Sequence, residues 1–188
     1  MKKLTSAVVM LTGILFLAGC DINKIPTLDE AVKAQWAQVQ NQYQRRADLI
    51  PNLVEVVKGF ATQEKEVLTA VTEARAKATQ MTLPSDVLTN PQAFQAFQQN
   101  QGALTSALAR LMVVVERYPE LKSDRNFLEL QAQLEGTENR IAVARRDYIQ
   151  SVQEYNTEIR TFPGRLWAMT LYSDAEIKAS FEAVNPDA

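Results

Sequence analysis

The stretch NFLELQAQLEGTENRIAVARRDYIQSVQEYNTEIRTF, residues 126–162, decides the fold that this sequence predicts. Its apolar residues recur at steps of three, four or seven: Phe127, Leu130, Leu134, Ile141, Tyr148, Val152, Tyr155, Ile159 and Phe162. This spacing places them on one face of an α-helix, because a helix turns once in about 3.6 residues. The alternation with a period of two that marks a half-buried strand is absent. We therefore expect a long amphipathic helix whose apolar face must be covered by other helices.

The same apolar stripe runs through three further segments, which proline residues separate. Pro26 precedes the first, where Thr27 and Glu30 form a capping box. Pro51 interrupts the stripe without changing its phase, and a proline inside a helix removes a hydrogen bond and clashes with the preceding turn. The predicted fold class is all-α, an elongated up-and-down four-helix-type bundle with a kink or break near Pro51 and with Trp36 in its core. The expected helices cover residues 28–49, 51–80, 91–118 and 123–162.

The N-terminus has the features of a secretory signal peptide. Lys2 and Lys3 precede an uncharged stretch whose apolar core is shorter than the roughly 20 residues that a bilayer span needs. It ends in Leu17-Ala18-Gly19-Cys20, which resembles the lipobox of bacterial lipoproteins, where the cysteine thiol is acylated and the peptide is cut just before it. Cys20, the single cysteine of the chain, is therefore the predicted lipidation site. An uncleaved membrane anchor is the alternative.

These features divide the chain into four predicted parts: a lipoprotein signal peptide (1–19), a lipid anchor and tether (20–27), the helical bundle (28–167) and a C-terminal tail (168–188). The tail is too short and too mixed to span a bilayer, and docking back on the bundle is one fate for it. Asp21 resembles the inner-membrane retention signal of enteric-type lipoproteins. Where that sorting rule applies, the bundle would be lipid-anchored to the cell membrane at the periplasmic face of the inner membrane.

The composition argues against most enzyme chemistry. The chain contains no histidine, which removes the usual general base and the commonest metal ligand. Acylation of Cys20 would remove thiolate chemistry as well. Glu135 and Glu138 share a helix face, so an all-carboxylate site stays open, although acids at that spacing are more often solvated or salt-bridged. No catalytic residue, cofactor or metal site is predicted.

Two blocks of polar residues stand out against the apolar stripe. They contain Arg45, Arg46, Asp48 and Asn52 around the proline, and Glu138, Asn139, Arg140 and Arg145 in the last helix. One interpretation is a set of interhelical salt bridges and hydrogen bonds that fix the register of the helices. The other is a surface that binds a partner. The first predicts that Arg46, Asp48, Glu138 and Arg145 point inward and pair with one another, whereas the second predicts an outward cluster.

Several motifs resemble those of the LemA family: Gln44–Val54, Val57–Ala61, Tyr118–Lys122 with Asn126, Phe127, Leu130 and Gln131, Thr137–Ala142 with Ala144 and Arg145, Tyr155-Asn156 and Phe162-Pro163. The resemblance covers roughly residues 28–167 and implies an up-and-down helical bundle, an N-terminal membrane attachment and no assigned biochemical activity. The chain departs from the family pattern at Gln63-Glu64, where many members have a histidine before the glutamate. It departs again in its lipobox, because many members resemble proteins anchored by an uncleaved helix.

We therefore expect a membrane-anchored, LemA-like helical-bundle protein of the cell envelope that acts as a non-enzymatic scaffold or adaptor. Two alternatives stay open, an accessory modulator of an envelope protease or sensor, and a carboxylate- or metal-dependent enzyme. The expected partners are the membrane, through the N-terminal acyl chains, and an unidentified envelope protein; homo-oligomer formation is left open. Nucleic acid is not expected, because the chain from Cys20 onward carries 18 Lys and Arg against 22 Asp and Glu without a clustered basic face.

Overall fold

The computed structural model of the chain describes residues 22–80 and 84–181, so Cys20 and the predicted signal peptide lie outside the described residues. Every regular element in this part is helical, which confirms the all-α prediction. The long helices are α2 (Lys24–Phe60), α3 (Lys65–Gln80), α4 (Pro91–Val115) and α6 (Arg125–Arg160), and the short ones are α5 (Pro119–Lys122) and α7 (Gly164–Thr170).

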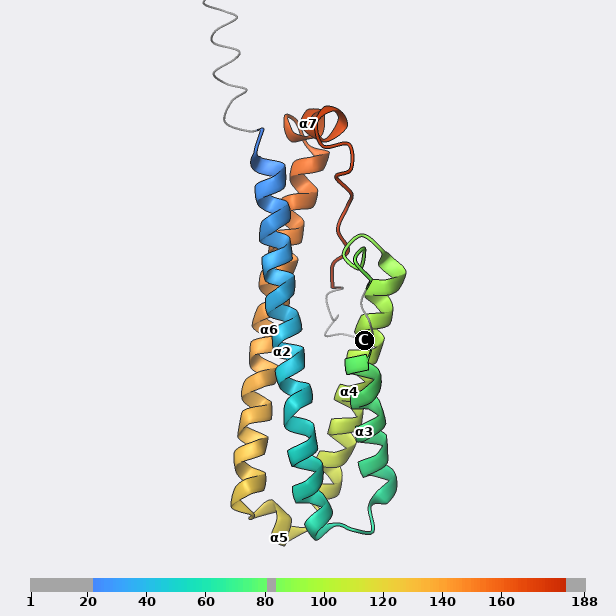
Figure 1. Cartoon of the computed structure of the whole chain (residues 1–188). Coiled ribbons are helices and arrows are strands. Elements are labelled where there is room, and N and C mark those ends of the chain that lie inside the picture. The colour runs from blue at the N-terminus through green and yellow to red at the C-terminus, as the bar shows by residue number, and fades with distance from the viewer. Residues whose placement is uncertain (1–21, 81–83, 182–188) are drawn as a thin grey trace, which may run out of the picture.

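The long helices run up and down in an elongated bundle (Figure 1). α2 and α6 lie side by side in opposite directions, and α3 and α4 form a shorter hairpin next to them. The 37 residues of α2 span about 55 Å at 1.5 Å per residue. α7 lies at the end of the bundle where α2 begins, and α5 lies at the opposite end. Among the described helices, none combines the length and the apolar character that a bilayer crossing requires.

The sequence predicted a kink or break near Pro51, with separate helices over residues 28–49 and 51–80. The structure shows no break there, because α2 continues through Pro51 to Phe60. Pro51 has no N–H to offer the carbonyl of Ala47, four residues before it. Arg75 of α3 donates from Nε to that carbonyl oxygen at 2.8 Å. A donor from a neighbouring helix thus satisfies the carbonyl that the proline leaves free, and the break falls at the turn between α2 and α3.

The same helix also begins earlier than predicted, at Lys24 rather than at residue 28. Pro26 fits in its first turn, because the first N–H groups of a helix have no partner within the helix. Thr27 is therefore inside the helix and does not cap it. Its hydroxyl donates instead to the carbonyl of Asn23 at 2.7 Å.

Apolar side chains form two core clusters, one nearer each end of the bundle. We call the one nearer α7 the upper core, and it includes Trp36, Tyr43, Phe94, Phe97, Ile141, Tyr148 and Phe181. The lower core includes Ile50, Leu53, Leu104, Leu111, Phe127 and Leu134. Trp36 is buried in contact with four other aromatic rings, which confirms its predicted place in the core.

The chain beyond α7 turns back and docks along the bundle (Figure 1). The side-chain amide of Asn156 donates to the carbonyl of Lys178 and accepts from its N–H, both at 2.9 Å. The hydroxyl of Tyr148 donates to the carbonyl of Ala179 at 2.7 Å, and the N–H of Ala179 donates to the carbonyl of Leu88 at 2.6 Å. These bonds place Phe181 in the upper core, so the described part of the tail, up to Phe181, belongs to the folded bundle.

Candidate functional site

Arg46 lies inside the bundle, at the boundary between the two core clusters. It is three residues after Tyr43 of the upper core and four before Ile50 of the lower core, so it shares their face of α2. Only 1% of the residue is exposed, which is rare for an arginine. The apolar stripe of the helix therefore carries a guanidinium group into the interior.

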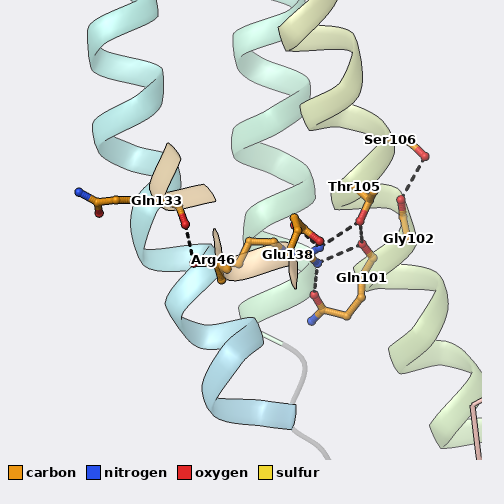
Figure 2. Close-up of polar contacts among 8 residues, drawn as sticks. Arg46, Gln101, Gly102, Thr105, Ser106, Gln133 and Glu138 are labelled. Carbon is orange, nitrogen blue, oxygen red and sulfur yellow. Dashed lines mark hydrogen bonds and ion pairs between the residues drawn. The ribbon is translucent and has the colours of Figure 1, made fainter. Parts of the chain in front are cut away.

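Hydrogen bonds join this guanidinium to two other helices (Figure 2). Nη1 donates to the hydroxyl of Thr105 on α4 and to Oε1 of Glu138 on α6, each at 3.0 Å. Nη2 donates to the side-chain oxygen of Gln101 at 2.6 Å and to its carbonyl at 3.2 Å. We call these four residues the polar layer.

The polar layer separates the upper and lower cores on each helix that contributes to it. On α4, Gln101 falls between Phe97 and Leu104, which belong to the upper and lower cores. The amide nitrogen of Gln101 also lies 3.4 Å from the carbonyl of Ala78 on α3, at the long end of hydrogen-bond distance. All four long helices therefore meet at this level, where a sliding helix would leave buried polar groups without partners.

The ion pair in the layer is asymmetric. The side chain of Arg46 is 2% exposed, whereas that of Glu138 is 41% exposed. The carboxylate therefore keeps contact with water, while the guanidinium depends on protein oxygens for its hydrogen bonds. A cleft of about 290 Å³ borders the layer and is also lined by Gln98 and Arg145.

Arg145 lines this cleft without an ion pair to Glu138 or Asp48. Its guanidinium carbon lies 4.4 Å from the centre of the Phe181 ring, so it covers the docked tail. Burial raises the pKa of the nearby Tyr43 phenol, although the positive charges of Arg145 and Arg46 oppose the shift. The phenol is therefore neutral at physiological pH.

The other predicted site residues point away from the layer. Asp48 is exposed and accepts a hydrogen bond from the amide of Gln44, one turn earlier on α2, at 2.7 Å. Four more residues are exposed, and their side chains form no hydrogen bond or ion pair with another described residue: Arg45, Asn52, Asn139 and Arg140. The two polar blocks thus divide into an inward pair, Arg46 with Glu138, and an exposed set. We call the exposed residues the outward set: Arg45, Asp48, Asn52, Asn139 and Arg140.

The two glutamates considered for a carboxylate site serve different contacts. Glu138 binds Arg46, and Glu135 is exposed and accepts a hydrogen bond from the amide of Gln131 at 2.9 Å. Within residues 22–80 and 84–181, no group of three or more His, Cys, Asp or Glu side chains could hold a metal ion.

Sequence reasoning missed Gln101, Thr105 and Asn156. A signal for Gln101 was present, because it occupies an inward position of the apolar stripe in the third predicted helix, where its neighbours are Phe97 and Leu104. The sequence shows Asn156 only as part of a motif with Tyr155. Its role depends on the tail, which meets it 22 residues later in the chain.

Together these features define an all-α bundle protein in which a buried arginine joins the helices at one central level. The chain belongs to the LemA family, whose model matches residues 35–188. The match extends through the C-terminal tail, beyond the range of roughly 28–167 on which the resemblance was based.

Two curated magnetosome proteins illustrate the relatives of this chain. It is 26% identical over 157 residues to magnetosome protein MamQ 2 of Paramagnetospirillum magneticum, a match covering 75% of this chain and 58% of the relative. It is 25% identical over 163 residues to magnetosome protein MamQ of Magnetospirillum gryphiswaldense, covering 78% and 60%. The chain thus spans less than two thirds of the length of the relatives it matches.

Proposed function

We propose that this chain is a non-enzymatic scaffold or adaptor of the bacterial cell envelope, held at the membrane by acyl groups on Cys20. The main support is the place of the lipobox-like Leu17-Ala18-Gly19-Cys20, which ends four residues before α2 begins at Lys24. A bundle that starts so close to an acylated residue is held against the membrane. Asp21 favours the periplasmic face of the inner membrane as the location.

The use of the polar groups supports a scaffold. The buried guanidinium of Arg46 is bound by oxygens of the chain itself, so the polar layer holds the helices together. The outward set on α2 and α6 stays free to contact a partner protein, and we propose that it does so. The relatives are named for the magnetosome and not for a reaction, which also favours a structural role.

Replacement of the anchor residue tests the membrane attachment. We expect Cys20→Ala to abolish labelling of the chain by an alkyne analogue of palmitate and to leave a precursor that retains residues 1–19. The measurement is click detection of the label together with the intact mass of the purified chain. Unchanged labelling, or a mature mass that excludes acyl groups on wild-type Cys20, would contradict the proposal.

Position-specific cross-linking in membranes tests the adaptor role. A photo-reactive amino acid at Arg140, in the outward set, is expected to give an adduct of defined mass, while the same group at the exposed Gln99 on α4 gives none. An adduct of twice the chain mass would identify a second copy as the partner. Equal adducts at both positions, or none at Arg140, would count against a partner surface on α6.

A further inference from the structure

Four large apolar side chains are exposed within one short segment at the end of α6 and along α7. Phe162 is 85% exposed, Met169 70%, Leu171 58% and Leu166 48%. The other exposed large apolar residues of the described chain are spread along the bundle: Phe60, Val113, Leu128, Val143 and Ile177. Isolated apolar residues on a surface are ordinary, but a local concentration marks a contact site. We call the segment from Phe162 to Leu171 the apolar cap.

The apolar cap is held firmly at one end of the bundle. Gly164 packs so closely against the backbone and side chain of Glu158 that a side chain on Gly164 would collide with both. The carboxylate of Glu158 also binds the ammonium group of Lys24, in the first turn of α2, at 2.6 Å. The cap, the end of α6 and the start of α2 therefore form one unit (Figure 1).

The position of the cap relative to the N-terminus identifies what covers it. Lys24 is four residues after Cys20, and four extended residues reach at most about 14 Å. An acylated Cys20 therefore keeps this end of the bundle next to the bilayer. The opposite end of α2 lies about 55 Å away along the helix axis.

The charge of the segment also suits a bilayer surface. Residues 159–173 contain two basic side chains, Arg160 and Arg165, and no acidic one. Both arginines are exposed, beside the apolar side chains. Apolar groups flanked by cations are the combination that enters the interface of a membrane containing anionic lipids.

We propose that the apolar cap inserts into the lipid interface as a second membrane contact beside the acyl chains, an inference that rests on the proposed attachment through Cys20. The acyl chains alone would hold the bundle only at its N-terminus. Insertion of Phe162, Leu166, Met169 and Leu171 fixes its orientation as well, with α2 and α6 projecting from the membrane and the α2–α3 turn far from it.

Depth measurements on the full chain test this proposal. The chain is reconstituted into vesicles of phosphatidylethanolamine and phosphatidylglycerol, with an environment-sensitive fluorophore at Met169→Cys and nitroxide-bearing lipids as quenchers. The matched control carries the fluorophore at Thr62→Cys, in the exposed turn between α2 and α3. We expect quenching at Met169→Cys to exceed that at Thr62→Cys by at least about twofold. Equal quenching at the two positions would overturn the proposal.

A second variant separates insertion from incidental proximity. Adding Phe162→Ser and Leu166→Ser to Met169→Cys removes two exposed apolar groups, and we expect most of the quenching to be lost while the helical circular dichroism is unchanged. Quenching that persists would refute the role of these side chains. A fluorophore that is shielded without vesicles, and becomes exposed on dilution, would instead show that a second copy covers the cap.

The proposed attachment is read out separately on the same samples. The fraction of wild-type chain that stays with the vesicles after an alkaline wash, compared with Cys20→Ala, reports the acyl anchor. If the chain stays with the vesicles but Met169→Cys shows no excess quenching, insertion of the apolar cap is refuted and the acyl anchor is not. A chain that washes off contradicts the anchor, and its quenching on added vesicles still decides whether the cap inserts.

Discussion

At the scale of single residues, the environment of Arg46 is the most unusual feature of the described chain. Its guanidinium is buried, yet only one of its partners is an anion, and that anion is partly hydrated. The uncharged oxygens of Gln101 and Thr105 accept its other hydrogen bonds, and its buried Nε has no hydrogen-bond partner among the described residues. Removing one partner of a buried hydrogen bond leaves the other partner unsatisfied and lowers stability. Replacing both partners by apolar groups can leave the stability nearly unchanged.

Substitutions in the polar layer should therefore be non-additive. We expect Arg46→Met to lower the free energy of unfolding by about 2–3 kcal/mol, because it leaves the amide of Gln101 without its donor. Adding Gln101→Leu should recover most of that loss. Glu138→Gln should cost less than Arg46→Met, because the amide oxygen of glutamine can still accept the hydrogen bond from Arg46 at this partly exposed position. Urea unfolding of residues 21–188 at pH 7, followed by circular dichroism, measures all three.

Two outcomes among these variants would contradict this account of the polar layer. If Glu138→Gln destabilises the bundle as much as Arg46→Met does, the ion pair and not the amide contacts would dominate the layer. If Gln101→Leu adds a further loss to Arg46→Met, the two residues would act independently.

At the scale of elements, the continuity of α2 depends on α3. A proline inside a helix deletes the donor to the carbonyl four residues before it, and Arg75 supplies a donor to that oxygen from outside the helix. The bond ties the middle of α2 to the hairpin formed by α3 and α4. The same contact thus keeps α2 intact and locates α3 beside it.

A double-mutant cycle on Pro51 and Arg75 measures this dependence. Arg75→Ala should cost about 1–2 kcal/mol of unfolding free energy in the natural chain, because the carbonyl of Ala47 loses its donor. In the Pro51→Ala background the helix itself supplies a donor, so the cost should fall by about 1 kcal/mol. The measurement is the difference between the two urea-unfolding comparisons. Equal costs in both backgrounds would show that Arg75 acts through some other contact.

At the scale of the whole molecule, the C-terminal tail closes the upper half of the bundle. α3 and α4 are shorter than α2 and α6, so the upper core needs another cover. The tail supplies it, because Phe181 packs against Trp36, Phe94 and Tyr148 with ring-centre distances of 6.4, 5.0 and 5.6 Å. Asn156 holds the backbone that delivers this ring.

Replacement of Asn156 should therefore release the tail. Asn156→Leu leaves the N–H and carbonyl of Lys178 without partners, and we expect a loss of about 2 kcal/mol in the free energy of docking. Limited proteolysis with mass spectrometry should then show faster cleavage between α7 and Phe181. Asn139→Leu is the matched control, because Asn139 is exposed on the same helix and forms no side-chain hydrogen bond with a described residue. Equal cleavage rates in the two variants would contradict the role of Asn156.

Much of the fold was predictable because helical periodicity is a local property of the chain. The apolar stripe correctly indicated four long helices, whereas the polar blocks left open whether Arg46 lies inside the bundle or on its surface. The helix boundary predicted at Pro51 was wrong because it depends on a contact that is not local in sequence. Whether a proline ends a helix depends on whether another group reaches the freed carbonyl, and Arg75 is 28 residues away in sequence.

The sequence by itself therefore determined the all-α class and the hydrogen-bonding demand of Arg46, but it left open whether Arg46 points inward. Only the tertiary structure decided which groups meet that demand, because Gln101 and Glu138 lie 55 and 92 residues away along the chain. It also decided that the tail fills the upper core and that the apolar cap lies beside the start of α2. A residue's need for burial or for a hydrogen bond is local, whereas the partner that satisfies it depends on the path of the chain.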